Sequence, residues 1–595
     1  MFANKKQANI ISVAIIALIS LCIYYSSLNN QFLNDWDDGT YVTTNTDIKP
    51  APNESLAKNA FTKFSNGHYH PLTTISYGLE YKLFGLEAKP FHVFNLLLHI
   101  LNALLVFAFI KLLAGDVLIA FITSLLFAVH PMHVESVAWI SDRKDLLCTL
   151  YYLGALCIYL LYLKKGGNKL YAFTFLLFVA ALLSKAMAIT LPIVMLVIDY
   201  FKDRKFSSKI IIEKIPFFIL SLIFGYLSIL AQKSSDALGD VAALSIIDRI
   251  AFSGYSLTMY IIKLFWFQGL SAFYNYPLLE NGAYPLIYYV LPLVLLVLFF
   301  VLFRLRELRK TIIFSFGFFM VTIGLVLQII PAGNVIMADR YTYLPYIGLF
   351  FMLAVFAKQL MGKSKKYTYA VSAILFIYAG ACSYFAFART KVWHDSMTLW
   401  SNTIKNNPDA ALPYNNRAVL FINAQQFSLA LADLNKAVEI RPSYVNARYN
   451  RGTVLIRLEK FNGAIQDFTF VSQHECRDIV SVYMYRGDAY MRLQNYLSAI
   501  GDFSSAIQNN PGLQQAYYNR GLAYYTINKF QEGASDFSAA LKLNPGFTQA
   551  YYLRGLSFYK LQDFKQAYAD ISYAAKMGYR VNPNLISEIN SKLAQ

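Results

Sequence analysis

The stretch NDWDDGTYVT, Asn34 to Thr43, places three carboxylates within four positions, at Asp35, Asp37 and Asp38. No Lys or Arg lies within this aspartate turn, which directly follows a long apolar run. A carboxylate beside a membrane can accept a proton from a reacting hydroxyl. A loop at a membrane surface is also often polar, so simple solvation is the alternative for each acid. The turn is therefore a candidate catalytic group.

Three further connections place ionisable residues between apolar runs. They are the second loop HPMHVESVAWISDRKD (His130 to Asp145), the lysine turn SKAM (Ser184 to Met187) and the arginine loop PAGNVIMADRYTY (Pro331 to Tyr343). Ionisable residues at the ends of membrane spans commonly mark a site that faces a cavity in the helix bundle. A shared site requires that all four connections emerge on the same side of the membrane, so the arrangement of the spans decides the question.

The composition indicates a membrane protein. Of the 595 residues, 56% are apolar and only 15% are charged, whereas a soluble protein of this length carries more charge. Apolar runs near 20 residues, each long enough to cross ~30 Å of hydrocarbon, recur as far as Phe387. We place them at 9–27, 92–113, 116–130, 145–163, 170–184, 186–201, 214–232, 249–268, 285–304, 311–331, 341–360 and 367–387. We expect an all-α, polytopic helix bundle at 1–388.

The first run begins as a signal peptide does, with the basic stretch MFANKKQAN. Its apolar core is long, however, and YYSSLNNQF offers a poor small-residue cleavage site. We therefore expect an uncleaved first span, followed by a first extracytoplasmic loop at 28–91.

Positive charge orients the spans, because Lys and Arg in short loops are retained on the cytoplasmic side. The basic clusters lie at 5–6, 164–169, 202–205, 304–310 and 363–366. With these clusters inside, the N-terminus is cytoplasmic and all four ionisable connections lie outside. All five basic clusters lie on the cytoplasmic side if the chain crosses the membrane about eleven times. This number requires that 249–268, which contains Lys263, is re-entrant or interfacial. The part after Arg389 then lies outside as well.

The net charge of +18 does not indicate nucleic acid, since more than half of the excess lies before Arg389 and much of it in the inner loops. The five Cys form neither a CxxC metal signature nor a pairing framework, so we expect no structural disulfide.

The C-terminal part repeats with a period of 34 or 35 residues, in the motifs NNRA, YNRG, MYRG, YNRG and YLRG around Arg417, Arg451, Arg486, Arg520 and Arg554. This period is typical of tetratricopeptide repeats, which are helix–turn–helix units. A small residue opens each second helix, at Ala430, Ala464, Ala499, Gly533 and Ala567. A larger apolar residue follows four positions later, at Leu434, Phe468, Phe503, Phe537 and Ile571. The pattern predicts a five-unit α-solenoid at 408–579, a linker at 389–407 and a capping helix at 580–595.

Two features of the repeats bear on function. Arg replaces the signature Leu in all five units, either as an ordered row or with its stem packed on apolar surface and its head in water. The concave groove is expected to be lined partly by Asn415, Tyr449, Met484, Tyr518 and Tyr552. Such grooves bind peptide or protein, and the sequence does not select the ligand.

The chain resembles the integral-membrane GT-C glycosyltransferases, in the protein O-mannosyltransferase-like branch that carries tetratricopeptide repeats. The likeness is carried by FLNDWDDGTYVTTN, HYHPLTTISYGLEYKLFGLEAKPFHVFNLLLHILNALLVF, FAVHPMHVESVAWISDRKDLL, LLSKAMAITLPIVMLVIDY and MADRYTYLPYIGLF. The order of these motifs and the repeats extend it over about the whole chain. In this family a polyprenyl-phosphate sugar donates its glycosyl group on the non-cytoplasmic face.

The resemblance implies roles for several residues. The family's acid pair maps onto Asp37 and Asp38, of which Asp38 is preferred as the base, while Asp35 is an extra acid. The leaving lipid phosphate needs cations or strong donors, and the candidates are Arg340 first, Arg143 and Lys144 second, and then Lys185. The animal branch has Lys-Glu where this chain has Lys185 and Ala186, so one acid of that pattern is missing.

Other candidates have structural alternatives. His70 either hydrogen-bonds a substrate or starts a helix with Pro71. His130, His133 and Glu135 lie within six residues and could bind substrate or a divalent metal. The resemblance implies metal-independent chemistry without a cofactor, so the metal site is not favoured. Tyr341 either stacks on sugar or belongs to the interfacial aromatic belt.

Taken together, the resemblance implies an inverting glycosyltransferase whose acceptor is an extracytoplasmic protein hydroxyl, recruited by the repeats. Its partners are membrane lipid, the polyprenyl-phosphate sugar and the acceptor protein or peptide, and its location is a bacterial inner membrane with the repeats in the periplasm. The alternative is a non-catalytic membrane-anchored scaffold that displays the repeats. A transporter fits poorly, because the ionisable residues cluster in loops and no inverted repeat is visible.

Overall fold

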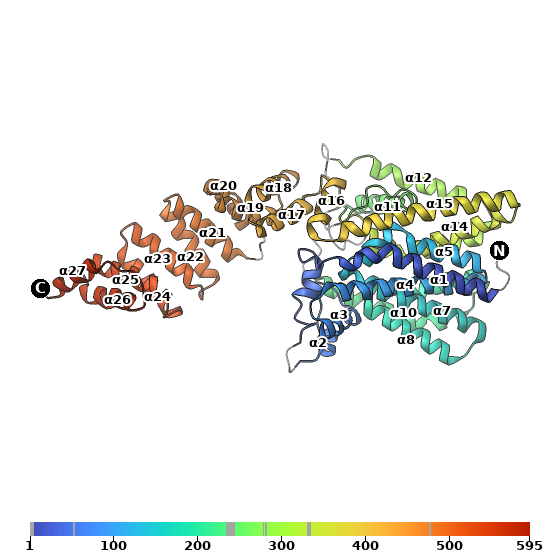
Figure 1. The fold of residues 1–595 in the computed structure, drawn as a ribbon, viewed down its shortest axis with the longest axis horizontal. Helices are drawn as coiled ribbons and strands as arrows, with labels where there is room; N and C mark the ends of the chain where they lie inside the picture. Colours follow the sequence, from blue (N-terminus) through green and yellow to red (C-terminus); the bar gives the residue numbers. More distant parts are fainter. Residues whose placement is uncertain are drawn as a thin grey trace. The chain divides into compact units, whose positions relative to one another are not determined.

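The computed structural model describes residues 5–50, 54–233, 244–277, 279, 283–329, 335–474, 476 and 478–594. The chain forms two compact units, Met1–Ala410 and Ala411–Gln595 (Figure 1). Both are built from helices, and the described residues contain isolated β-bridges but no strand. The predicted all-α class is therefore confirmed.

Among the described residues of the first unit, six segments are long and apolar enough to cross a membrane. They contain α1 (Lys5–Tyr24), α4 (Ala88–Ala114), α7 (Arg143–Lys165), α10 (Ser208–Lys233), α13 (Arg309–Ile323) and α15 (Lys365–Thr390). A seventh candidate pairs α5 (Val117–Val129) with Pro131–Ala138 across a 55° bend. Shorter apolar helices are α8 (Asn168–Ser184), α9 (Leu191–Phe201), α12 (Ile287–Phe303) and α14 (Tyr346–Met361). The chain is thus a multi-pass membrane protein.

These segments bear on the number of crossings. If the bent pair is one span and the four shorter helices also cross, the described residues provide eleven, the number that the charge pattern predicts. The apolar run at 249–268 corresponds to α11 (Ile246–Lys263), which is not one of these candidate spans. The crossing count itself stays a prediction.

The centre of the first unit is formed by α4, which packs against α1, α5 and α7, while α5 also packs against α14. Sharp turns at one end of this group follow from local sequence. At the end of α4, Gly115 adopts a left-handed conformation, with φ +72°, that closes the helix at little steric cost. Asp116 then caps α5 by accepting a hydrogen bond from the Ile119 amide at 2.9 Å. By contrast, α12 buries no residue, so its apolar side chains are available to lipid.

The opposite ends of these helices carry the connections that hold the candidate residues. The aspartate turn precedes α2 (Leu56–Thr62) and α3 (Pro71–Phe84), and α6 (Val134–Ala138) lies in the second loop. Residues 331–334 of the arginine loop lie outside the described residues. The stretch 389–407, predicted as a linker, contains α16 (Ser396–Asn406), which belongs to the first unit.

The second unit consists of five helix pairs and a final helix, as expected for a tetratricopeptide solenoid. The pairs are α17 (Ala411–Asn423) with α18 (Phe427–Ile440), α19 (Val445–Arg457) with α20 (Phe461–Ser472), α21 (Ile479–Arg492) with α22 (Tyr496–Asn509), α23 (Gln514–Thr526) with α24 (Phe530–Leu543), and α25 (Thr548–Lys560) with α26 (Phe564–Lys576). The final helix, α27 (Pro583–Leu593), packs on α26. The predicted small and apolar positions of the second helices are buried in every unit.

The row of repeat arginines is ordered. Each guanidinium donates two hydrogen bonds, at 2.7 to 2.9 Å, to the Asp sixteen positions later, in the pairs Arg417–Asp433, Arg451–Asp467, Arg486–Asp502, Arg520–Asp536 and Arg554–Asp570. The third nitrogen of four of them reaches a polar side chain of the preceding unit, such as Ser504 for Arg520 at 2.9 Å. The alternative of stem packing with a solvated head is therefore wrong. We call this row the arginine ladder.

Candidate functional site at the outer loops

Hydrogen bonds join the four ionisable connections. The aspartate turn is bonded to the second loop through Asp38 and Ser141. The second loop is bonded to the lysine turn through Asp145 and Lys185, and to the arginine loop through Glu135 and Arg340. The residues that the charge pattern places on one side of the membrane thus lie together at one end of the first unit.

Asp38 holds the aspartate turn in place. It is fully buried, and its carboxylate accepts hydrogen bonds from the amides of Leu33 and Ser141, both at 2.9 Å, and from the Ser141 hydroxyl. A Cβ at Gly39 would lie 2.4 Å from the Asn34 carbonyl oxygen, so only glycine permits this tight turn. Burial raises the pKa of Asp38 to about 6, although the three hydrogen bonds act to lower it. A carboxylate so fully engaged is poorly placed to bind an acceptor, which reverses the preference of the sequence analysis for Asp38.

Asp37 is the available acid of the turn. It is half-buried and, among the described residues, its carboxylate has no hydrogen-bond or ion-pair partner. It acts electrostatically on Lys144, whose ammonium lies 4.6 Å from the centre of the Tyr41 ring and 5.8 Å from that of Trp139. Lys144 also forms no ion pair within the described part of the chain. An acid and a cation that are unpaired within the described residues therefore lie close enough to interact electrostatically.

Arg340 is oriented by the second loop. Its amide donates to Glu135 at 3.1 Å, and one of its terminal nitrogens pairs with the other carboxylate oxygen of Glu135. The guanidinium lies 5.4 Å from the centre of the Trp139 ring and 4.9 Å from that of Tyr341. Its remaining N–H groups have no partner among the described residues and are available to an anion. Tyr341 thus supports this arginine, and its predicted contact with sugar is untested.

Lys185, Asp145 and Asp142 belong to the same group of ionisable residues as Asp37, Lys144 and Arg340. We call this group the cluster. Lys185, at the C-terminal end of α8, pairs with Asp145, which is buried. Asp142 is also fully buried, and neither of its carboxylate oxygens has a hydrogen-bond partner among the described residues. It interacts electrostatically with Lys185, Arg340 and Lys144. A buried carboxylate without hydrogen bonds is costly in a fold, so Asp142 belongs with the functional groups.

Arg143 differs from the other predicted phosphate ligands, because its head group is fully used within the fold. It donates to Asn95 at 2.8 Å, to Glu80 at 2.5 Å and to the Phe91 carbonyl at 3.0 Å. Its guanidinium also lies 4.6 Å from the centre of the Tyr77 ring, and the residue is completely buried. It joins α3, α4 and α7, and each of its three guanidinium nitrogens has a protein partner.

His70 lies beside the cations at the start of α3. Its side chain makes no cap hydrogen bond to the helix amides, and its Nε2 atom is buried without a partner. Burial and the positive charge of Lys144 lower the pKa of His70 to about 3, so the ring is neutral. The ring packs on Tyr41 at 5.2 Å between centres. A neutral imidazole with one free nitrogen can exchange a hydrogen bond with a substrate.

His130, His133 and Glu135 do not converge. His130 Nε2 lies 3.2 Å from the carbonyl of Leu264, and His133 Nδ1 lies 2.8 Å from the carbonyl of Phe127. Both rings are buried among aromatic residues, and Glu135 pairs with Arg340. The two rings lie 5.8 Å apart between centres, and the contact of these three residues with a substrate stays a prediction.

The predicted groove residues of the repeats take part in packing between units. Asn415 is buried and accepts a hydrogen bond from Asn450 at 2.9 Å, whereas Met484 is half-buried. The three tyrosines are half-buried against further rings, in the pairs Tyr449–Phe468, Tyr518–Phe547 and Tyr552–Tyr579. Their exposed portions are available to a ligand.

Sequence reasoning missed Asp142, although it selected the next two residues of SDRKD, Arg143 and Lys144. A signal was present, because Asp142 and Asp145 are three residues apart at the start of α7, a spacing that places two side chains on one helix face. An acid pair of this spacing beside two basic residues was a reason to include it.

Comparisons with known proteins agree with both units. A family model described as tetratricopeptide repeat matches residues 449–514 and 518–578. Protein O-mannosyl-transferase TMTC3 of Homo sapiens is 23% identical over 532 residues, which cover 78% of this chain and 54% of that protein. Protein O-mannosyl-transferase TMTC2 of Homo sapiens is 33% identical over 156 residues, or 25% of this chain and 18% of that protein.

The chain is similar to these transferases, to TMTC3 over most of its own length and to TMTC2 over a quarter of it. It spans about half the length of the TMTC3 relative that it matches. Among solved structures, the crystal structure of YrrB, a tetratricopeptide protein with an unusual peptide-binding site, is 21% identical with a TM-score of 0.30, covering 32% of this chain and 97% of that chain.

Proposed function

We propose that the chain is a glycosyltransferase that moves a sugar from a polyprenyl-phosphate donor to a hydroxyl of an extracytoplasmic protein. The observation that carries the proposal lies at one end of a membrane helix bundle. Within the described part of the chain, Asp37 and Lys144 are unpaired there, and Arg340 has N–H groups available to an anion. Homology to the protein O-mannosyl-transferases supports the reaction class. The donor class rests on the sequence resemblance alone.

Asp37 acts as the general base in this proposal. A Ser or Thr hydroxyl is a poor nucleophile, so a carboxylate must accept its proton as the oxygen attacks the anomeric carbon. The bond from that carbon to the phosphate oxygen breaks in the same step, and the configuration at the carbon inverts. Asp37 suits this role better than Asp38, because its oxygens are not occupied by hydrogen bonds from the fold.

Arg340, Lys144 and Lys185 bind the phosphate. The leaving lipid phosphate gains negative charge, and cations held in a poorly hydrated site stabilise this charge strongly. Arg340 offers free N–H groups, whereas Lys185 is shared with Asp145. His70 orients a substrate hydroxyl through its free Nε2 atom. The step requires no metal or cofactor.

The remaining parts follow from the charge pattern and the repeats. The N-terminus lies in the cytoplasm, the site and repeats lie outside, and the repeats recruit the acceptor protein. A bacterial inner membrane fits a polyprenyl-phosphate donor and a periplasmic acceptor.

The test compares glycosylated proteins, by mass spectrometry, in cells that carry the parent, Asp37→Asn, Arg340→Ala or Asp47→Asn at equal membrane levels. Asp47 is the control, because it lies after the same turn and pairs with Lys63 away from the cluster. Loss of the base or of the phosphate ligand should each lower product by about 100-fold or more. Parental product in both variants would show that the chain is a scaffold rather than a transferase.

A further inference from the structure

Helix α16 is bonded to the aspartate turn. The carboxylate of Asp35 accepts hydrogen bonds from the Ser396 hydroxyl and from the indole N–H of Trp400. Ser396 and Trp400 are four residues apart and so lie on the same face of α16. The Trp36 ring also packs edge-on against Trp400, with 4.9 Å between centres. The acid that the sequence suggested as an extra is therefore the contact that ties the turn to this helix.

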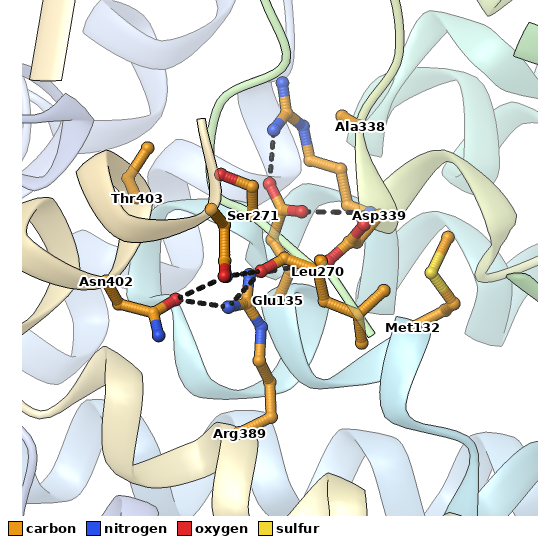
Figure 2. Close-up of polar contacts among 12 residues, drawn as sticks. Met132, Glu135, Leu270, Ser271, Ala338, Asp339, Arg389, Asn402 and Thr403 are labelled. Atoms are coloured by element: carbon orange, nitrogen blue, oxygen red, sulfur yellow. Dashed lines mark hydrogen bonds and ion pairs between the residues drawn. The ribbon is translucent and has the colours of Figure 1, made fainter. Parts of the chain in front are cut away.

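The same helix is linked to the arginine loop through Arg389 of α15. Asp339, the neighbour of Arg340, accepts hydrogen bonds from Tyr274 at 2.6 Å and from Arg389 at 3.4 Å. Arg389 is buried at the end of α15 and donates in turn to the side chain of Asn402 on α16 at 3.0 Å. Figure 2 shows Arg389 between Asn402 and Asp339, with Glu135 beside them.

Aromatic packing joins the same elements. Four of the five tryptophans of the chain lie in one cluster, from the aspartate turn, the second loop, the end of α15 and α16. Ring centres are separated by 6.1 Å for Trp36–Trp139, 5.8 Å for Trp139–Trp393 and 4.9 Å for Trp36–Trp400. The fifth, Trp266, is 60% exposed. Such packing resists small displacements, because buried rings leave little free space.

We infer that α16 is a positioning element of the transferase centre, which sets Asp37 through Asp35 and Arg340 through Asp339. The inference rests on the proposed function. The base and the phosphate ligand come from loops about 300 residues apart in sequence. One short helix, bonded directly to Asp35 and through Arg389 to Asp339, fixes the distance between them. A misplacement near 1 Å can lower a rate by about 100-fold, so these contacts act on the chemical step without touching substrate.

The experiment uses the full chain in lipid nanodiscs. Trp400→Phe keeps an aromatic ring and removes the N–H donor, and Ser396→Ala removes the second donor. Asn402→Ala removes the acceptor on α16 to which Arg389 donates. Trp266→Phe is the matched control outside the cluster. Hydrogen–deuterium exchange is followed in peptides that cover 33–43 and 336–343, and transferase rate is measured with acceptor peptide and membrane-extracted lipid-linked sugar.

The Trp400→Phe/Ser396→Ala protein should exchange faster over 33–43, and Asn402→Ala should exchange faster over 336–343. Both should lower kcat by about 10-fold to 100-fold and change KM by less than about threefold, since no substrate contact is lost. The control should match the parent in every measurement. Parental exchange in both regions, or faster exchange with parental kcat, would overturn the positioning role.

Asp37→Asn, measured in parallel, keeps the two proposals separate. If Asp37→Asn retains full activity, the proposed function fails whatever α16 does. If Asp37→Asn is inactive while the α16 variants keep the parental kcat, only the positioning role of α16 fails.

Discussion

The two units of the chain use charged residues in different ways. In the repeats, each Arg of the ladder donates two hydrogen bonds to one Asp, and the carboxylates are nearly buried. At the outer end of the membrane unit, Asp37 and Lys144 have no partner among the described residues, and Asp142 is buried without a hydrogen bond. The ladder satisfies its charges within the fold, whereas the cluster leaves several unsatisfied.

This difference separates supporting residues from functional ones even within the membrane unit. Arg143 and Asp38 resemble the ladder, because each guanidinium nitrogen and each carboxylate oxygen is bonded to a protein group. Arg340 and Asp37, by contrast, keep polar atoms that have no partner among the described residues. Unpaired polar groups are expensive to keep in a folded protein, and they persist where a ligand supplies the missing partner.

The largest expected effect concerns Arg143 and its buried partner Glu80. Arg143→Ala removes one member of a buried ion pair and leaves the other charge uncompensated, which costs about 3–5 kcal/mol. We expect a clear fall in membrane level and in the unfolding temperature of the purified protein. Lys144→Ala, the matched control at the next position, breaks no ion pair among the described residues, so it should lose activity and keep the parental unfolding temperature. Equal stability of the two variants would remove the distinction between them.

The sequence determined the regions of the site but not the residues within them. Charge orientation grouped the four connections, because positive-inside retention acts on whole loops. It could not choose between Arg143 and Lys144, since consecutive residues on a helix point about 100° apart and only packing decides which is buried. The sequence could likewise not choose between Asp37 and Asp38, because their roles depend on one tight turn at Gly39.

The repeats were more predictable, since each unit packs only on its neighbours and a local period specifies the fold. The Asp partners of the ladder also recur with the same period, at Asp433, Asp467, Asp502, Asp536 and Asp570. Comparing the two periodic rows would have identified the pairs. Helix α16 had no such signal, because its contacts with Asp35 and Arg389 are specific to this chain's tertiary packing.

A second prediction concerns pH and Asp38. Burial raises its pKa from 3.8 to about 6, so the folded state holds this proton more tightly than the unfolded state. The contribution of Asp38 to the free energy of unfolding is thus fully present below about pH 4 and falls by up to about 1.4 kcal/mol per pH unit until about pH 6. Unfolding by urea between pH 4 and 7 measures this slope.

Ser141→Ala sharpens that measurement. The Ser141 hydroxyl donates to the Asp38 carboxylate and so favours its charged form. Without this bond the pKa of Asp38 should rise further, and the upper end of the falling range should move to higher pH. Asp38→Asn should lack this part of the slope. An identical slope in all three proteins would assign the pH dependence to other groups.

The prediction with the smallest expected effect compares one kind of substitution, Asp to Asn, in the repeats and in the membrane unit. Asp502→Asn removes a charge-assisted pair with Arg486 and should lower the free energy of unfolding of the repeats by about 1–3 kcal/mol. Asp142→Asn breaks no hydrogen bond among the described residues, so the membrane unit should keep its stability while transferase rate falls. Differential scanning calorimetry and product formation on the two proteins measure both quantities. If Asp142→Asn destabilised the membrane unit as strongly as Asp502→Asn destabilises the repeats, Asp142 would stabilise the fold. The absence of a hydrogen bond would then no longer distinguish functional charged residues from structural ones.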